Sequence, residues 1–207
     1  MTKLKVPHRM HFHFGAYVIT SEDHVKIAEE ACKGGARVIQ YRDKNSSRQD
    51  MLEIADKIRK ITKKFGSLFI VNDFIDVALM SGADGVHLGQ DDIPVQRARE
   101  ITQKGFIIGF STHSLEQAKE AEKEGADYIG IGPVFSTPTK ENYKPIGVST
   151  VEEVLRNINI PVVAIGGINI GNIDRLIEIG VHNVAMVREF QEKALEKVKK
   201  INFLLKV

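Results

Sequence analysis

The stretch Gly-Ala-Asp-Gly-Val-His-Leu-Gly-Gln-Asp-Asp (82–92) contains the unit from which the chain is built. Its Gly-Ala pair is typical of a helix end, where glycine supplies a left-handed cap. The run that follows, residues 85–90, is mostly apolar without strict alternation, and this favours a strand buried on both faces of a parallel sheet. Two acids close the stretch, at the point where such a strand would end.

Weak copies of this unit recur along the chain. Gly-Ala-Arg-Val (35–38), Gly-Ala-Asp-Tyr-Ile (125–129) and Gly-Val-His-Asn-Val (180–184) each end a helical pattern and enter an apolar run. In all, eight runs have the composition of buried strands: residues 14–20, 37–43, 68–73, 85–90, 106–112, 128–135, 161–167 and 183–189.

Amphipathic stretches lie between these runs. Residues 21–35, 47–66 and 114–125 each begin with a serine and end on glycine, as capped helices do. The last stretch, 189–207, spaces its apolar residues along one helical face, namely Phe190, Ala194, Val198, Ile201 and Leu205. Eight strand–helix units indicate an α/β fold, a compact (β/α)₈ TIM barrel that forms one domain over residues 1–207. A doubly wound open sheet is the rival, but no GxGxxG turn follows the first run.

Composition excludes several classes of protein. The 207 residues are 43% apolar and 27% charged, as in a globular protein, and the net charge is +2. Because the two signs of charge are interleaved, we expect no nucleic-acid partner. The single Cys32 excludes an internal disulfide and a multi-cysteine metal site. No apolar run approaches the roughly 20 residues of a membrane helix. With no signal peptide recognised, we expect a cytoplasmic enzyme or binding protein for small molecules.

Polar residues are concentrated where the predicted strands end. In a (β/α)₈ barrel these ends meet at one mouth, where functional residues lie. A core requires none of the polar groups found there, which are residues 40–44, 72–73, 87–92, 111–113, 136–140, 166–167 and Arg188. This concentration predicts a site at the mouth.

The charged residues of this mouth suggest that it binds a diphosphate. Asp73 and Asp92 follow neighbouring strands and could bind one hard cation such as Mg²⁺, which takes few protein oxygens and accepts phosphate oxygens. Arg42, Lys44 and Lys140 add positive charge. A diphosphate held in this way would be a leaving group.

A second phosphate would fit the other side of the mouth. Thr137, Thr139 and Gly167 offer hydroxyl and backbone donors there, together with the end of the last strand. The pattern therefore predicts a reaction between two phosphorylated substrates.

Several of these residues also have a structural interpretation. Arg42 and Lys44 could simply pair with Asp43 or with other nearby acids at the rim. His87, inside an apolar run, is more readily a hydrogen-bonded core histidine than a ligand. His113 is either an acid–base catalyst or a residue at the entry of a helix.

Seven motifs stand in order along the chain: AYVIT (16–20), VIQYRDK (38–44), FIVNDFIDVAL (69–79), ADGVHLGQDD (83–92), GFSTHS (109–114), ADYIGIGPVFSTPTK (126–140) and AIGGI (164–168). As a set they closely resemble the thiamine phosphate synthase family. The resemblance implies a (β/α)₈ barrel that joins hydroxymethylpyrimidine diphosphate to a thiazole phosphate. Pyrophosphate would leave first, in a dissociative, Mg²⁺-assisted reaction without a protein nucleophile. A homo-oligomer is also expected from the resemblance.

The resemblance also implies roles for individual residues. The pyrimidine diphosphate would contact Gln40, Arg42, Lys44, Asn72, Ser111 and Lys140, of which Arg42, Lys44, Ser111 and Lys140 would be catalytic. Mg²⁺ would be held by Asp73 and Asp92. The thiazole phosphate would be received by Thr137, Thr139, Gly167 and the backbone of Val187 and Arg188, and the neighbouring Tyr41, Asp43 and Pro138 are expected among the substrate-binding residues.

One departure from the family pattern lies at residues 187–189. The family usually has a small residue there, typically Ser, followed by Ala, whereas this chain has Arg188 and Glu189. Arg188 could contact a phosphate, crowd the thiazole pocket or turn outward to pair with Glu189. One alternative function is a TenI-type thiazole tautomerase, which would use His113 for proton transfer. The other is a non-catalytic phosphate-binding barrel, which only Arg188 favours.

Overall fold

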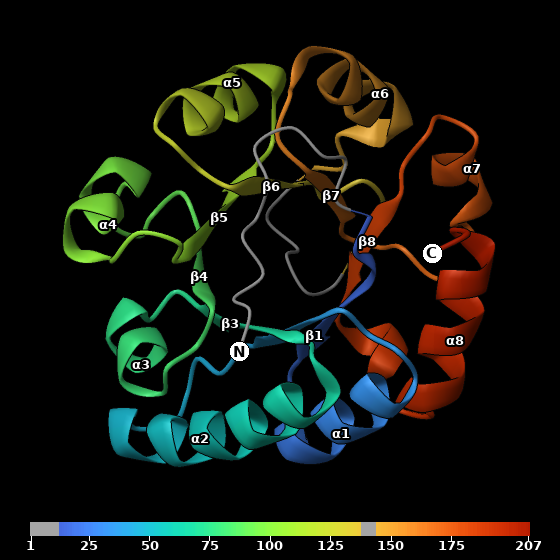
Figure 1. Ribbon diagram of the computed structural model, residues 1–207. Helices are drawn as coiled ribbons and strands as arrows, with labels where there is room; N and C mark the ends of the chain where they lie inside the picture. The colour runs from blue at the N-terminus through green and yellow to red at the C-terminus, as the bar shows by residue number, and fades with distance from the viewer. Residues whose placement is uncertain (1–12, 138–143) are drawn as a thin grey trace.

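The computed structural model describes residues 13–137 and 144–207, in which eight parallel strands close into a barrel in sequence order (Figure 1). The strands are β1 (Gly15–Thr20), β2 (Val38–Tyr41), β3 (Leu68–Asn72), β4 (Gly85–Leu88), β5 (Ile107–Thr112), β6 (Tyr128–Ile131), β7 (Val162–Ile165) and β8 (Asn183–Met186). The predicted (β/α)₈ barrel is confirmed.

Helices form a ring around the barrel (Figure 1). They are α1 (His24–Lys33), α2 (Arg48–Phe65), α3 (Ile75–Met80), α4 (Val95–Ile101), α5 (Leu115–Lys123), α6 (Gly147–Asn157), α7 (Asp174–Ile177), the 3₁₀ helix η2 (Arg188–Phe190) and α8 (Ala194–Leu204). Among the described residues, none of these helices combines the length and apolarity needed to cross a membrane.

Two helices differ from the sequence prediction. The predicted serine start of α1 is wrong, because the helix begins at His24, preceded by Asp23 in a left-handed conformation (φ +40°) without a side-chain cap. The predicted helix 189–207 is interrupted, since Lys193 also has a left-handed backbone (φ +53°). Ser47 and Ser114 do cap α2 and α5, accepting hydrogen bonds from the Asp50 and Gln117 N–H groups.

Strand alternation separates two hydrophobic cores. One lies between the sheet and the helices, and the other fills the barrel with residues such as Tyr17, Val38, Ile70 and Tyr128. Polar residues point inward two positions further along several strands, and pairing aligns them, as in Asn72 with His87 on β3 and β4. The inner core therefore forms the floor of a polar chamber at the carboxyl ends of the strands.

The aspartate of each Gly-Ala-Asp repeat contacts both the neighbouring strand and an arginine of a helix. The Asp84 carboxylate accepts hydrogen bonds of 2.8 and 3.0 Å from the Arg59 guanidinium and one of 2.8 Å from the Phe69 N–H. Asp127, at the equivalent place in its repeat, accepts from the Ile108 N–H at 2.7 Å and pairs with Arg99. The acid of the repeat is thus a structural anchor at the amino end of a strand.

Replacing Asp84 with alanine should lower the free energy of unfolding by about 2 kcal/mol, because the Phe69 N–H and the Arg59 guanidinium would lose their acceptor. Urea unfolding measures this change. Glu120→Ala is the matched control, since it removes only an exposed pair with Lys123 (3.3 Å) and should leave unfolding nearly unchanged. Equal effects of the two substitutions would contradict the anchoring role.

Candidate functional site

A cavity of about 520 Å³ opens at the carboxyl ends of the strands. Its volume lies in the range of small-molecule sites. It brings together most of the site residues predicted from the sequence: Gln40, Arg42, Lys44, Asn72, Asp73, Asp92, Ser111, Thr137, Gly167, Val187 and Arg188. Tyr41 and Asp43 lie outside this lining, and Pro138, Thr139 and Lys140 fall outside the described residues.

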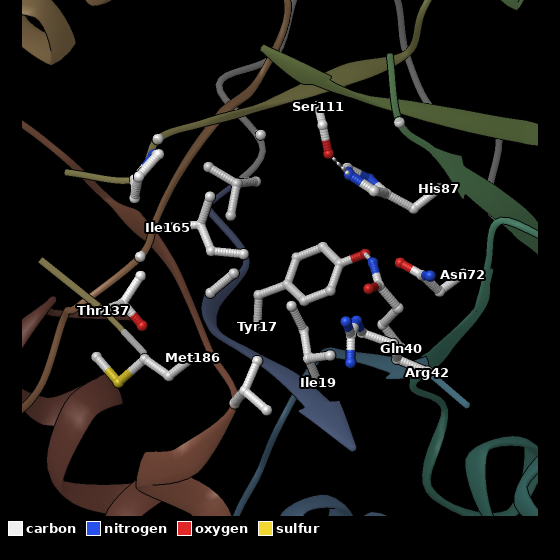
Figure 2. Close-up of a pocket in the computed structure, with 18 of the residues that line it drawn as sticks. Tyr17, Ile19, Gln40, Arg42, Asn72, His87, Ser111, Thr137, Ile165 and Met186 are labelled. Atoms are coloured by element: carbon white, nitrogen blue, oxygen red, sulfur yellow. Dashed lines mark hydrogen bonds between the residues drawn. The ribbon is translucent and has the colours of Figure 1, made fainter. Parts of the chain in front are cut away.

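The cavity has two unlike walls (Figure 2). Figure 2 shows Gln40, Arg42, Asn72, His87 and Ser111 gathered on one side, from strands β2 to β5. Ile165, Met186 and Thr137 lie on the opposite side, with Tyr17 and Ile19 between the two walls. This arrangement suits a ligand with a charged end and an apolar body.

A chain of hydrogen bonds crosses the floor of the cavity. Gln40 Nε2 donates to Tyr17 Oη at 2.8 Å, and the Tyr17 and Tyr128 hydroxyl oxygens are 2.6 Å apart. Tyr128 Oη lies 3.0 Å from His87 Nδ1, and His87 Nε2 lies 2.9 Å from Ser111 Oγ. Burial raises the pKa of both tyrosines, so both hydroxyls keep their protons at neutral pH.

Tyr17 and Tyr128, the two tyrosines of this hydrogen-bond chain, were not predicted as site residues. Each lies within an apolar run, where an aromatic residue is normally core. The only sequence signal is Gly109 on β5, which faces Tyr128: a Cβ at position 109 would lie 2.1 Å from Tyr128 Cζ. His87 is hydrogen-bonded as predicted, but it also lines the cavity.

Asp73 and Asp92 face each other in the cavity. Partial burial, and next the Asp73 carboxylate, raise the pKa of Asp92, although the Gly89 N–H donates to it at 2.6 Å. Lys44 Nζ lies 3.5 Å from Asp73 Oδ2. Asp73 itself has a left-handed backbone (φ +63°), a conformation that costs energy and is frequent at functional sites. The acid pair therefore concentrates negative charge that a cation would relieve.

Two nitrogen donors in the cavity lack acceptors among residues 13–137 and 144–207. Asn72 is 7% exposed and its Nδ2 has no hydrogen-bond partner there. Arg42 has no carboxylate partner within the same residues, so the alternative of rim pairing is wrong for Arg42, whereas Lys44 does pair with a nearby acid, Asp73. An unsatisfied buried donor is costly, which favours a ligand that accepts hydrogen bonds at this wall.

The opposite side is formed around a glycine turn. Gly166 and Gly167 have φ values of +95° and +68°, and a Cβ on Gly167 would lie 2.6 Å from the Ser136 carbonyl oxygen. Glycine therefore allows the segment before Thr137 to pack directly on the end of β7. Gly166 and Gly167 both line the cavity.

Arg188 lines the cavity and is exposed. The expected alternative that it pairs with Glu189 is wrong, since the Glu189 carboxylate pairs with Lys197 at 3.6 Å. Arg188 forms no ion pair in the part of the chain that the structure describes. His113 is at the entry of α5, where its N–H donates to Gln117 Oε1 at 2.7 Å, and its ring also lines the cavity.

Comparison with known proteins agrees with this geometry. The family profile described as thiamine monophosphate synthase matches residues 16–190. The thiamine-phosphate synthase of Pyrococcus horikoshii is 48% identical over 83% of this chain and 84% of its own length. That of Halalkalibacterium halodurans is 44% identical over 85% and 87%. The solved thiamine phosphate pyrophosphorylase from Pyrococcus furiosus is 39% identical, with a TM-score of 0.87 over 94% of this chain and 96% of its own.

Tyr128→Phe should lower the free energy of unfolding by about 1–2 kcal/mol, because the buried Tyr17 hydroxyl and His87 Nδ1 lose a shared partner. It should also change the nitrogen chemical shifts of the His87 ring, measured by NMR. Ser81→Ala is a suitable control, since the Ser81 hydroxyl donates to Val77 O at 2.7 Å within its own helix region. Unchanged His87 shifts in Tyr128→Phe would contradict the hydrogen-bond chain.

Proposed function

The chain belongs to the thiamine monophosphate synthase family, and from this premise we propose how its cavity joins two substrates. The activity is that of a transferase that forms thiamine phosphate. We propose that hydroxymethylpyrimidine diphosphate and a thiazole phosphate are the substrates. The observation that carries the proposal is one cavity with an acid pair and unpaired donors on one side and a glycine turn with Arg188 on the other.

The polar wall would bind the pyrimidine diphosphate. Arg42 and the Asn72 Nδ2 donor have no acceptor within residues 13–137 and 144–207 and would take phosphate oxygens, and Lys44 adds charge beside them. Gln40 and Ser111 are oriented by the hydrogen-bond chain and would contact the pyrimidine. Lys140, outside the described residues, is proposed to join them because it completes the STPTK motif.

The acid pair fits a Mg²⁺ ion. Two facing carboxylates with a raised Asp92 pKa provide the hard oxygen ligands that Mg²⁺ prefers. Within the described ranges no group of three His, Cys, Asp or Glu side chains converges, at this pair or elsewhere, so water or diphosphate oxygens would complete the coordination. Asp73 and Asp92 would hold the ion, and when bound it would neutralise charge on the departing pyrophosphate.

The other wall would bind the thiazole phosphate. Gly167, Thr137 and the backbone at Val187 line the cavity there, and Arg188 adds a guanidinium suited to two phosphate oxygens. Pro138 and Thr139 follow Thr137 directly, and we propose that they extend this contact. The Arg188 departure would thus strengthen the phosphate site.

The proposed reaction is dissociative. Arg42, Lys44 and Lys140 would stabilise the leaving pyrophosphate, and the pyrimidine methylene cation would be captured by the thiazole nitrogen. The protein supplies positioning and electrostatic stabilisation, and no side chain acts as nucleophile. Ile19, Ile165 and Met186 line the cavity and would keep water from capturing the cation instead.

The direct test is pyrophosphate release from the purified protein with both substrates, with and without Mg²⁺. We expect release and thiamine phosphate formation only when both substrates and the ion are present. Thiazole tautomerisation that is lost in His113→Ala, without pyrophosphate release, would favour the tautomerase. Inactivity in both assays would favour a phosphate-binding barrel.

Asp92→Ala should reduce Mg²⁺-dependent turnover by about 100-fold or more, because the departing charge would lose its counter-ion. The variant should keep the fold, as measured by circular dichroism. Asp91→Ala is the matched control, since this neighbouring carboxylate lines the same cavity but is not proposed as a ligand. Turnover unchanged in Asp92→Ala would contradict the metal assignment.

Arg188→Ser should raise the KM for the thiazole phosphate about tenfold and leave the KM for the pyrimidine diphosphate unchanged. Added salt should shrink this difference, because Arg188 is exposed. Arg156→Ala, on the outer face of α6 and paired with Glu152, should change neither KM. A KM effect on the pyrimidine diphosphate alone would place Arg188 at the wrong wall.

A further inference from the structure

A second cluster of polar side chains lies next to the end of β2, on the side away from the cavity that Arg42 and Lys44 line. It consists of Thr20 at the end of β1, His24 at the start of α1, and Tyr41 and Asp43 at the end of β2, and we call it the Asp43 cluster. Gln40, Arg42 and Lys44 line the cavity, whereas Tyr41 and Asp43, at the alternate positions, do not. The cluster therefore occupies the outer side of the same segment.

Both carboxylate oxygens of Asp43 are engaged within this cluster and its loop. Oδ1 accepts hydrogen bonds from the Asn45 and Ser46 N–H groups at 2.9 and 3.1 Å. Oδ2 accepts from the Tyr41 hydroxyl at 3.2 Å and lies 3.8 Å from His24 Nε2. Partial burial opposes ionisation, but the hydrogen bonds outweigh it and lower the pKa of Asp43 to about 2.

His24 is itself held in place from two sides. Its Nδ1 lies 2.8 Å from Thr20 Oγ1, and its ring packs edge-on against Tyr41 with 4.8 Å between the centroids. The preceding Asp23 has the left-handed backbone that starts α1 without a cap. A left-handed backbone costs a non-glycine residue energy, and here it directly precedes the histidine that these contacts hold.

Asp43 lies in the sequence between Arg42 and Lys44, so its contacts bear on the charge of both residues. A free carboxylate there would pair with Arg42 or Lys44 and cancel charge in the cavity. Instead its oxygens are occupied on the outer side, Lys44 pairs with Asp73 at the end of the neighbouring strand β3, and Arg42 has no carboxylate partner among the described residues. The same contacts fold the turn through residues 43–46, which sets where Arg42 and Lys44 stand.

We propose that Asp43 is a positioning residue that holds the β2–α2 loop so that Arg42 and Lys44 face the cavity, where both can contact a diphosphate. Tyr41 and His24 support it, and neither Asp43 nor Tyr41 contacts the substrate. This role replaces the direct substrate contact that the sequence resemblance implied for Tyr41 and Asp43. It deepens the proposed function and rests on it for the identity of the diphosphate substrate.

The test uses inorganic pyrophosphate as the probe, with its Kd measured by calorimetry in Mg²⁺ buffer, together with the KM of each substrate. Asp43→Ala should weaken pyrophosphate binding and raise the KM for the pyrimidine diphosphate by about tenfold, because the two cations would be misplaced. The KM for the thiazole phosphate should stay unchanged. Asp43→Asn should restore most of the affinity, since its amide oxygen still accepts from the loop N–H groups.

Ser47→Ala is the matched control for loss of stability. Its hydroxyl accepts from the Asp50 N–H at 3.2 Å, at the far end of the same loop, and caps α2 without touching Asp43. It should lower the melting temperature and leave the pyrophosphate Kd unchanged. An Asp43→Ala variant that behaves like Ser47→Ala, or that changes both KM values equally, would overturn the proposal.

A milder substitution covers the case in which Asp43→Ala does not fold. Tyr41→Phe removes only the hydroxyl bond to Asp43, and it should weaken pyrophosphate binding about threefold. An unchanged Kd in that variant would overturn the positioning role. If the wild type forms no thiamine phosphate but binds pyrophosphate, the proposed function fails while the comparison of Kd values still decides the role of Asp43.

Discussion

Alternation of side chains along parallel strands is the constraint on which this molecule depends. Once the strands close into a barrel, every second side chain must enter the interior, and the others must pack under the helices. The interior positions begin as an apolar layer that includes Val38 and Ile70 and continue two residues later as polar groups such as Gln40 and Asn72. The end of β2 extends the same rule beyond the sheet, since Arg42 lines the cavity and Asp43 does not.

The sequence predicted the barrel because its evidence is local and repeated. Strand composition and glycine helix ends occur in each unit, so the errors lie at boundaries: the run 37–43 corresponds to a strand of Val38–Tyr41. The excess residues belong to the loop that carries the cations, and apolar density alone does not separate strand from loop. Tyr17 and Tyr128 were missed for another reason, because only the closed barrel brings residues 111 positions apart within 2.6 Å.

Several features of the site lower the stability of the folded protein. Asp73 and Asp92 place like charges together, Asp73 has a left-handed backbone, and the buried Asn72 donor has no partner in the described chain. Each feature costs free energy in the empty protein. The proposed cation would relieve the charge repulsion and the proposed diphosphate would accept from Asn72, so these costs would be part of preorganisation. Anchors such as Asp84, at the other end of the barrel, offset it, since both oxygens of the Asp84 carboxylate accept hydrogen bonds.

The hydrogen bonds that link Gln40 to Ser111 can all point the same way, each group donating to the next. With Gln40 Nε2 donating to Tyr17, the tyrosine hydrogens point onward to Tyr128 and His87, and His87 Nε2–H then donates to Ser111 Oγ. In that state Ser111 keeps its own hydrogen for a ligand. A half-turn of the Gln40 amide reverses every link, and Ser111 then donates to His87 instead. Gln40 and Ser111, the two ends of this network on the same polar wall, are thus linked through the orientation of protons, with no movement of the backbone.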